Sequence, residues 1–236
     1  MDAFGLYYFD YTYFLFMVPA LIITMAAQIG VQSAFTKYSR VRTVRGMTGA
    51  QAAEAVARLG GAWVTIRPVA GNLTDFFDPR NHTINLSQNV YGSTSIAAIG
   101  VAAHEAGHSV QDAQGYFPNK IRTALVPITN IGSPLSMPLI LIGLLLPVQY
   151  DYVVYTGIAL YALVVLFQLA TLPVEFNASR RAIRALGETG ILTQEELVGA
   201  RKVLTAAAMT YLAASFTALV SLLRLLFIAG SRGRSD

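Results

Sequence analysis

The stretch YVVYTGIALYALVVLFQLATLPVEF, residues 152–176, decides the fold class of this chain. It contains no Asp, Glu, Lys or Arg over residues 152–174, and its first charged residue is Glu175. An uncharged, apolar run of this length is enough for a helix to cross a bilayer core of about 30 Å. The stretch therefore predicts a membrane-spanning helix that is followed directly by a carboxylate.

The rest of the chain has the same character. Of its 236 residues, 54% are hydrophobic and 13% are charged, which is about half the charged fraction of a typical soluble domain. Three further runs lack charged residues: 11–36, 123–150 and 203–223. We therefore expect a mainly α, polytopic membrane protein with about four transmembrane helices. Four prolines interrupt the run 123–150, so a buried hairpin or a re-entrant segment is an alternative there.

The basic residues predict the orientation in the membrane. If the N-terminus is outside, 14 of the 17 Lys and Arg residues fall in the two loops that face the cytoplasm, and Arg224, Arg232 and Arg234 fall on the other side. Cytoplasmic loops carry an excess of Lys and Arg. The predicted parts are an N-terminal transmembrane anchor (1–36), a cytoplasmic part (37–122), a transmembrane hairpin (123–174), cytoplasmic helices (175–202) and a C-terminal transmembrane helix with a tail (203–236).

The longer cytoplasmic loop predicts a small α+β domain. Thr48 and Gln51 form a capping-box pattern at the start of an Ala-rich segment, which indicates a short helix. Residues 62–87 carry β-branched and aromatic residues broken by turn signals, and they predict two or three short strands. Ser93 is then placed to cap a helix that ends near Gly115.

That last helix contains the segment VAAHEAGHSVQ, residues 101–111, with two of the three histidines in the chain. Residues four apart lie on one face of a helix, so His104 and His108 can converge on one ion. In the His-Glu-x-x-His arrangement the ion is usually zinc, and Glu105 can reach a water molecule without being a ligand. Two ordinary surface histidines are the alternative. The spacing predicts His104 and His108 as zinc ligands and Glu105 as the general base.

A catalytic zinc site needs a third protein ligand. The chain has no cysteine, so a carboxylate is the expected donor. The transmembrane hairpin returns the chain to the side where His104 lies and delivers Glu175 there, and we expect Glu175 as the third ligand. An interfacial anchor beside Arg180 and Arg181 is the alternative. His82, in a turn, is predicted to be an ordinary loop residue, with contact to the metal or the substrate as its alternative.

HEAGHSVQ and LPVEFNASRRA, together with the upstream LTDFFDPRNHTINLSQNVYGSTSIAAIGVAA, resemble the YugP-type family of bacterial membrane zinc metallopeptidases. The resemblance runs from about residue 73 to residue 184. It implies a zincin-like metallopeptidase domain with one Zn²⁺ per chain, held by His104, His108 and Glu175, with Glu105 as the catalytic base. The family is akin to gluzincins such as the HtpX-like and CAAX prenyl-protein proteases, which take a glutamate from a second helix.

One position departs from these relatives. Their ligand glutamate is commonly followed four residues on by an aspartate that orients a zinc histidine, and here that position is Ser179, with Asn177 also uncharged. Histidine ligands usually have such a partner. Asp112, one turn after His108, or a backbone carbonyl is the expected substitute.

The sequence thus predicts a membrane-embedded zinc endopeptidase in a bacterial cell membrane, with its active site on the cytoplasmic face. Its expected partners are the lipid bilayer and polypeptide substrates, among them membrane or membrane-proximal proteins. Nucleic acid is not expected, because no basic run is interleaved with aromatic residues. The segment NHTINLS is a candidate edge strand for an extended substrate. Candidate donors to the oxyanion are Tyr91, His82, Arg180 and Arg181.

Three other interpretations stay open. A non-catalytic zinc-binding scaffold or adaptor explains the spans but gives Glu105 no role. A transporter requires polar residues or broken helices at mid-membrane, for which the prolines of the second span are the only indication. A site-2-type protease buries the same motif inside a membrane helix, but the Leu-Asp-Gly and Asn-Pro-Asp-Gly motifs of such enzymes are absent.

Overall fold

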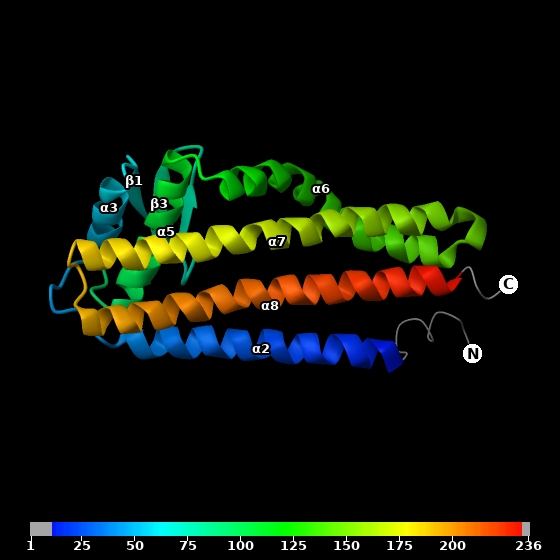
Figure 1. Cartoon of the computed structure of the whole chain (residues 1–236), viewed down its shortest axis with the longest axis horizontal. Helices are drawn as coiled ribbons and strands as arrows, with labels where there is room; N and C mark the ends of the chain where they lie inside the picture. The colour runs from blue at the N-terminus through cyan, green and yellow to red at the C-terminus, as the bar shows by residue number, and fades with distance from the viewer. Residues whose placement is uncertain (1–10, 233–236) are drawn as a thin grey trace. The chain divides into compact units, whose positions relative to one another are not determined.

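The computed structural model describes residues 11–232, and in this part the chain is mainly helical (Figure 1). Four helices are long and apolar enough to cross a membrane: α2 (Tyr11–Ser39), α6 (Phe117–Leu145), α7 (Asp151–Glu188) and α8 (Gln194–Arg232). Each includes most of one uncharged run, so four candidate spans are confirmed by length and composition. Residues 1–10 of the predicted anchor and 233–236 of the predicted tail lie outside the described residues.

The segment with four prolines forms one continuous helix. Helix α6 contains Pro127, Pro134 and Pro138 and ends before Pro147. A short 3-10 turn, η1 (Val148–Tyr150), connects it to α7. Proline removes one backbone N–H donor and usually kinks a helix, but here it does not end the helix. The hairpin alternative for this segment is therefore wrong.

Helix α7 extends well beyond the end of its uncharged run. The run ends at Val174, whereas the helix continues to Glu188. Glu175 therefore lies inside a continuous helix, and the helix geometry fixes the direction in which its side chain leaves the backbone.

The described residues divide into two compact units. The span unit comprises residues 11–26, 121–171 and 211–232, and the site unit comprises residues 27–120 and 172–210. In the span unit, helices α6, α7 and α8 share an apolar core that consists of Ile140, Val154, Ile158, Leu225 and Ala229. We describe the site unit by itself because it contains all residues of the predicted site.

The site unit holds the predicted small α+β part: α3 (Gly49–Leu59), β1 (Thr65–Val69), β2 (Phe76–Asp78), β3 (Thr83–Ser87), α4 (Gln88–Tyr91) and α5 (Ile96–Ala113). The strands form one sheet in the order β1-β3-β2, in which β3 is parallel to β1 and antiparallel to β2. The prediction of two or three strands is confirmed. The predicted edge strand is wrong, because NHTINLS forms β3, which has a partner on both sides.

Helices α3 and α5 pack on β3 and begin at capping residues. Thr48 and Gln51 form the predicted capping box of α3, with each backbone N–H donating to the side chain of the other residue. Ser95, rather than Ser93, caps α5, because its Oγ accepts from the N–H of Ala98 at 3.3 Å. Alanines and branched apolar side chains form the core between these elements: Ala52, Ala53, Val56, Ile84, Leu86, Ile99 and Ala102.

Candidate metal centre

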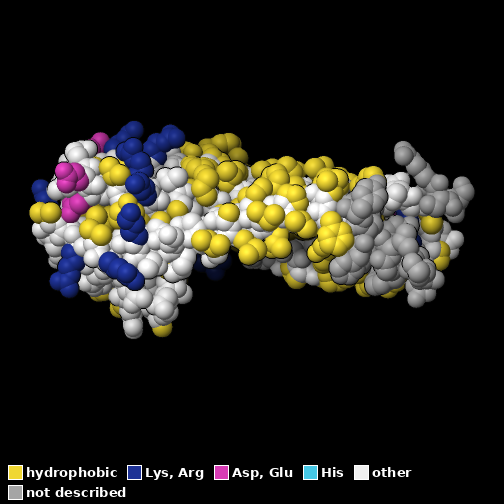
Figure 2. All heavy atoms as spheres, turned by 90° about the horizontal axis from the view of Figure 1, so that it is seen from below, with side chains coloured by type: hydrophobic (Ala, Val, Ile, Leu, Met, Phe, Trp, Pro, Cys, Tyr) yellow, Lys and Arg dark blue, Asp and Glu magenta, His cyan; other side chains and the backbone are white. Residues whose placement is uncertain are grey.

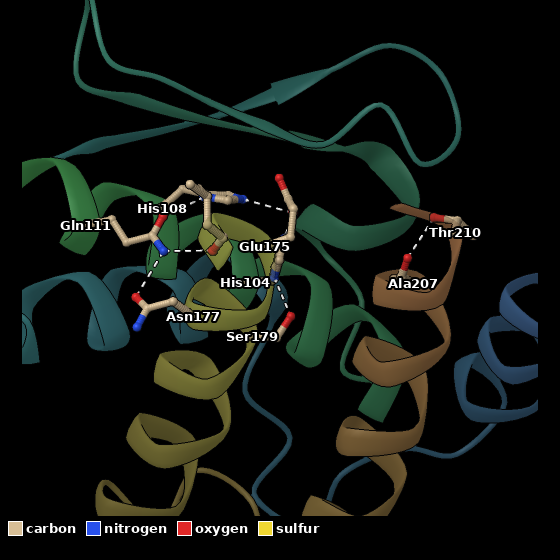
Figure 3. Close-up of polar contacts among 9 residues, drawn as sticks. His104, His108, Gln111, Glu175, Asn177, Ser179, Ala207 and Thr210 are labelled. Atoms are coloured by element: carbon tan, nitrogen blue, oxygen red, sulfur yellow. Dashed lines mark hydrogen bonds and ion pairs between the residues drawn. The ribbon is translucent and has the colours of Figure 1, made fainter. Parts of the chain in front are cut away.

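Helix α5 presents His104 and His108 toward α7 (Figure 3). The two residues between Glu105 and His108 are small. A Cβ atom on Gly107 would lie 2.6 Å from the carbonyl oxygen of Ala178 on α7, so only glycine permits this approach of the two helices. The close crossing brings both imidazoles next to α7.

Glu175 extends from α7 to both imidazoles (Figure 3). Its Oε2 lies 3.1 Å from Nε2 of His104 and 3.5 Å from Nε2 of His108. One donor atom from each of the three residues lies within 4.8 Å of the other two. Glu175 is only 2% exposed and, among the described residues, forms no ion pair with an arginine. The structure thus brings together the three predicted ligands, and the interfacial-anchor alternative does not fit the burial of Glu175.

A buried glutamine orients His108. Nδ1 of His108 lies 3.0 Å from Oε1 of Gln111. Nε2 of Gln111 donates to the carbonyl oxygen of Val174 at 2.8 Å and to Oδ1 of Asn177 at 3.0 Å. Because a carbonyl oxygen only accepts, the NH₂ group of Gln111 faces α7 and its oxygen faces His108. His108 must then donate from Nδ1, which leaves the Nε2 lone pair directed at Glu175.

Arg181 extends this network. Its Nε donates to Oδ1 of Asn177 at 2.7 Å, and its NH1 donates to Oε1 of Gln114 at 2.6 Å. The guanidinium also lies over the ring of Tyr116, 5.8 Å from the centroid. Arginine only donates, so it fixes the amide orientation of Asn177 that the hydrogen bond from Gln111 requires. These contacts do not support the predicted oxyanion role of Arg181.

Ser179 contacts the other histidine. Its Oγ lies 3.1 Å from Nδ1 of His104. On α7, Ser179 follows Glu175 by one turn, the position at which the resemblance to gluzincins predicts an aspartate. A hydroxyl therefore occupies the place of that carboxylate.

The predicted orienting role of Asp112 is wrong. Its Oδ2 lies 3.9 Å from Nδ1 of His82, whereas Gln111 contacts His108. On a helix, positions three and four residues after a given residue both return to its face, so the sequence could not separate Gln111 from Asp112. The spacing of three residues after His108 was the only sequence signal that pointed to Gln111. In the structure, the amide oxygen of Gln111 contacts the imidazole of His108.

Hydrogen-bond acceptors converge between the two helices. The Nε2 lone pair of His108 faces Oε2 of Glu175, which is an acceptor as well, so a proton or a metal cation is required between them. Burial lowers the pKa of His108, but the hydrogen bond with Glu175 and the charge of Glu105 outweigh it, and the pKa is raised above its usual value. Two imidazole nitrogens with one carboxylate oxygen are a donor set typical of catalytic zinc. The residues therefore fit a zinc ion.

Glu105 supplies a second carboxylate beside this donor set. It is 9% exposed, and no hydrogen bond or ion pair holds it among the described residues. Its charge is felt by Asp75, whose carboxylate accepts hydrogen bonds from the N–H and Oγ of Ser87 at 2.8 and 3.1 Å. Burial raises the pKa of Asp75 above its usual value. The hydrogen bonds from Ser87 lower this pKa, and the negative charge of Glu105 raises it further. Glu105 is thus a buried carboxylate that none of the described residues binds by a hydrogen bond or an ion pair.

The other candidates do not belong to the group of three converging residues. His82 adopts a left-handed backbone with φ 48° in the turn before β3, and its side chain is 64% exposed. It does not belong to the group of converging donor atoms, so the alternative of His82 as a metal ligand is wrong. Tyr91 packs against the core of the site unit. Arg180 lines a groove between α7 and α8.

Comparison with known proteins places the chain in a class of zinc peptidases. A family model described as "Putative neutral zinc metallopeptidase" matches residues 13–230, and the chain belongs to this family. The chain is also 41% identical, over 217 residues, to the protein named "Putative membrane protease YugP" of Bacillus subtilis (strain 168). The match covers 91% of this chain and 96% of that protein. No solved structure matches the chain.

These matches confirm the predicted family. Together with the four apolar helices, they support a multi-pass membrane protein of the protease class that uses zinc.

Proposed function

We propose that the chain is a membrane-embedded zinc endopeptidase of the gluzincin type. His104, His108 and Glu175 hold one zinc ion, and Glu105 is the catalytic base. The observation that supports this most strongly is the convergence of three potential metal-ligand atoms, from α5 and α7, beside Glu105, whose carboxylate has no partner among the described residues. A structural zinc site usually has four protein ligands, whereas three leave a position open for chemistry.

Zinc, when bound, supplies a Lewis acid that lowers the pKa of a water molecule and polarises the scissile carbonyl. Glu105 accepts a proton as the water oxygen attacks the carbonyl carbon, and it then donates this proton to the nitrogen of the leaving amine as the C–N bond breaks. Gln111 and Ser179 hold the imidazoles of His108 and His104 in place during these steps.

The substrate is an extended polypeptide that lies along an edge of the sheet. Because β3 is central, only β1 and β2 have unpaired edges within the described sheet. Of these two, β2 contacts α5. Strand β2 is therefore the strand beside which a substrate backbone is closest to the catalytic helix, and such pairing reads the sequence of the substrate only loosely.

The active site faces the cytoplasm in this proposal. The partition of basic residues leaves three exceptions on the outer side, and one of these, Arg232, has its charge compensated. It lies 3.1 Å from Oδ1 of Asp151 and donates to the carbonyl oxygen of Gly143 at 2.7 Å. The orientation rule counts Lys and Arg residues rather than net charge, so the proposed orientation rests on the partition of 14 basic residues against 3 and not on this pairing.

Cysteine labelling tests this orientation, because the natural chain has no cysteine. In intact cells, an impermeant thiol reagent should label Gln149→Cys and should label Lys37→Cys only after the membrane is opened. The reverse pattern would place the active site outside the cytoplasm.

Glu105→Gln tests the catalytic assignment. The amide keeps the size of the side chain but cannot accept the proton, so hydrolysis of an unfolded test protein should fall by at least roughly 10²- to 10⁴-fold, with the zinc content unchanged. Glu195→Gln, at an exposed position at the start of α8, is the matched control and should keep full activity. A Glu105→Gln variant as active as wild type would remove the proposed base, and a wild-type protein that binds zinc but cleaves nothing would favour a scaffold.

A further inference from the structure

A groove lies between α7 and α8 within the site unit. It encloses about 370 Å³, a volume within the range of small-ligand sites. Apolar side chains form much of its wall: Phe176, Ile183, Leu204 and Ala208. Arg180 and Arg201, one from each helix, add two positive charges to the same groove. The combination of an apolar wall and two cations fits an amphiphilic anion.

These two arginines have no protein partner among the residues that the structure describes. Both are exposed, and neither forms a hydrogen bond or an ion pair there. The adjacent Arg181, by contrast, is held by two hydrogen bonds and by the ring of Tyr116. Arg180 and Arg201 are therefore available to an external anion, whereas Arg181 serves the internal network.

The arginines stand at the ends of apolar runs. Arg180 follows the uncharged run 152–174 by six residues, and Arg201 precedes the run 203–223 by two. At 1.5 Å per residue these separations are about 9 Å and about 3 Å along the helices. Basic side chains at this depth reach the level of lipid headgroups. In Figure 2, several Lys and Arg side chains gather in one area of the face shown, with hydrophobic side chains among them.

We propose that this groove binds an anionic phospholipid, with its phosphate between Arg180 and Arg201 and an acyl chain along Phe176 and Ala208. The charge of the groove matches the headgroup, and its wall matches the chain. The groove also includes Ser179, the residue that contacts His104, so the bound lipid lies next to the metal centre. Lipid binding in this groove requires only its two arginines and its apolar wall, so it does not depend on peptidase activity.

Thermal unfolding of the full-length protein in mixed micelles tests the site. Phosphatidylglycerol should raise the Tm in a saturable way, and phosphatidylcholine should not. Arg180→Gln/Arg201→Gln should weaken the apparent affinity for phosphatidylglycerol by roughly 30-fold, because each basic side chain near a membrane surface contributes about fivefold. The matched control, Arg67→Gln/Arg80→Gln, removes two exposed charges elsewhere in the site unit and should leave the affinity within about twofold.

Further arms separate the lipid from other anions. Arg180→Lys/Arg201→Lys retains the charges, so it should retain most of the lipid affinity, and it keeps the test informative if the Gln variant does not fold. Equal loss in the control pair, or equal stabilisation by both lipids, overturns the proposal. Stabilisation by inorganic phosphate at the same concentration also overturns it. A further outcome would assign the groove to substrate instead. The protein would then show no selectivity between the lipids, and it would bind a peptide with a free C-terminus but not the same peptide with an amidated C-terminus. That binding would depend on the two arginines.

Discussion

Helix α7 approaches a neighbouring helix closely in each of the two units, and the two contacts differ in what surrounds them. In the span unit, a Cβ on Gly157 would lie 2.9 Å from the backbone nitrogen of Ile140 and 2.9 Å from the carbonyl oxygen of Ser136, both on α6. In the site unit, a Cβ on Gly107 of α5 would lie 2.6 Å from the carbonyl oxygen of Ala178. At both contacts, the glycine has no Cβ atom, and this allows the two helix backbones to approach each other closely.

The polar side chains near the two contacts are satisfied in different ways. In α6, Oγ of Ser136 donates to the carbonyl oxygen of Ser133 in its own helix. In the site unit, Ser179 and Gln111 bond across the helix boundary, to His104 and to the carbonyl oxygen of Val174. A hydroxyl that bonds within its own helix places no demand on a neighbour, whereas cross-helix bonds fix one helix against the other. At these two contacts, α7 thus packs against α6 through shape and against α5 through specific polar contacts.

Of the variants considered, Glu175→Ala should cause the largest change in zinc content and in stability. With two protein ligands left, the site holds zinc poorly, and α7 loses its link to both histidines of α5. Glu175→Ala should therefore purify with little zinc and gain little Tm from added zinc. Glu188→Ala, at the exposed end of the same helix, should match wild type in both measurements. Equal zinc content in the two variants would exclude Glu175 as a ligand.

The two glycines should respond with similar stability losses but different zinc contents. Gly107→Ala and Gly157→Ala each force a Cβ into backbone atoms, so each should lower stability by about 1–3 kcal/mol, measured as a drop in Tm. Only Gly107→Ala should also reduce zinc per folded molecule, because it separates α5 from α7. Gly30→Ala on α2, where the Cβ meets nothing within 4 Å, is the control. If Gly157→Ala lost zinc and Gly107→Ala kept it, the contact between α6 and α7, rather than that between α5 and α7, would control zinc binding.

Ser179→Ala should have a smaller, selective effect. It removes the hydroxyl beside Nδ1 of His104 but none of the three donors. Loss of such a partner typically costs 10- to 100-fold in metal affinity, and we expect the lower end, about tenfold, because the hydroxyl is neutral. Zinc titration against a competing chelator measures this. An unchanged affinity would show that Ser179 does not orient His104.

The convergence of His104, His108 and Glu175 was predictable, because the geometry is local or follows from the spans. His104 and His108 share a helix face by spacing alone, and Glu175 returns to their side through the hairpin 123–174. The fold class follows from the lengths of the uncharged runs, which the four helices reproduce.

The sequence could not decide features that depend on long-range contacts. Strand order is one of them, since nothing within NHTINLS indicates that both of its edges are paired. The choice between Ser93 and Ser95 as the cap depends on which hydroxyl reaches the N–H of Ala98. The pairing of Gln111 with His108 depends on Val174 and Asn177 of α7, which turn the amide oxygen toward the ring.

Ser136→Ala should produce the smallest change and completes the pair with Ser179→Ala. Ser136 is 2% exposed and is more deeply buried than Ser179, so burial alone would predict the larger effect for Ser136. Its hydroxyl, however, bonds only to the Ser133 carbonyl oxygen within α6, a bond that stabilises a helix little. We expect stability within about 0.5 kcal/mol of wild type and unchanged zinc affinity, because alanine leaves the contact with Gly157 intact. A tenfold loss of zinc affinity in Ser136→Ala would mean that the polar side chains of the span unit also control the metal centre, and the distinction between the two contacts of α7 would not hold.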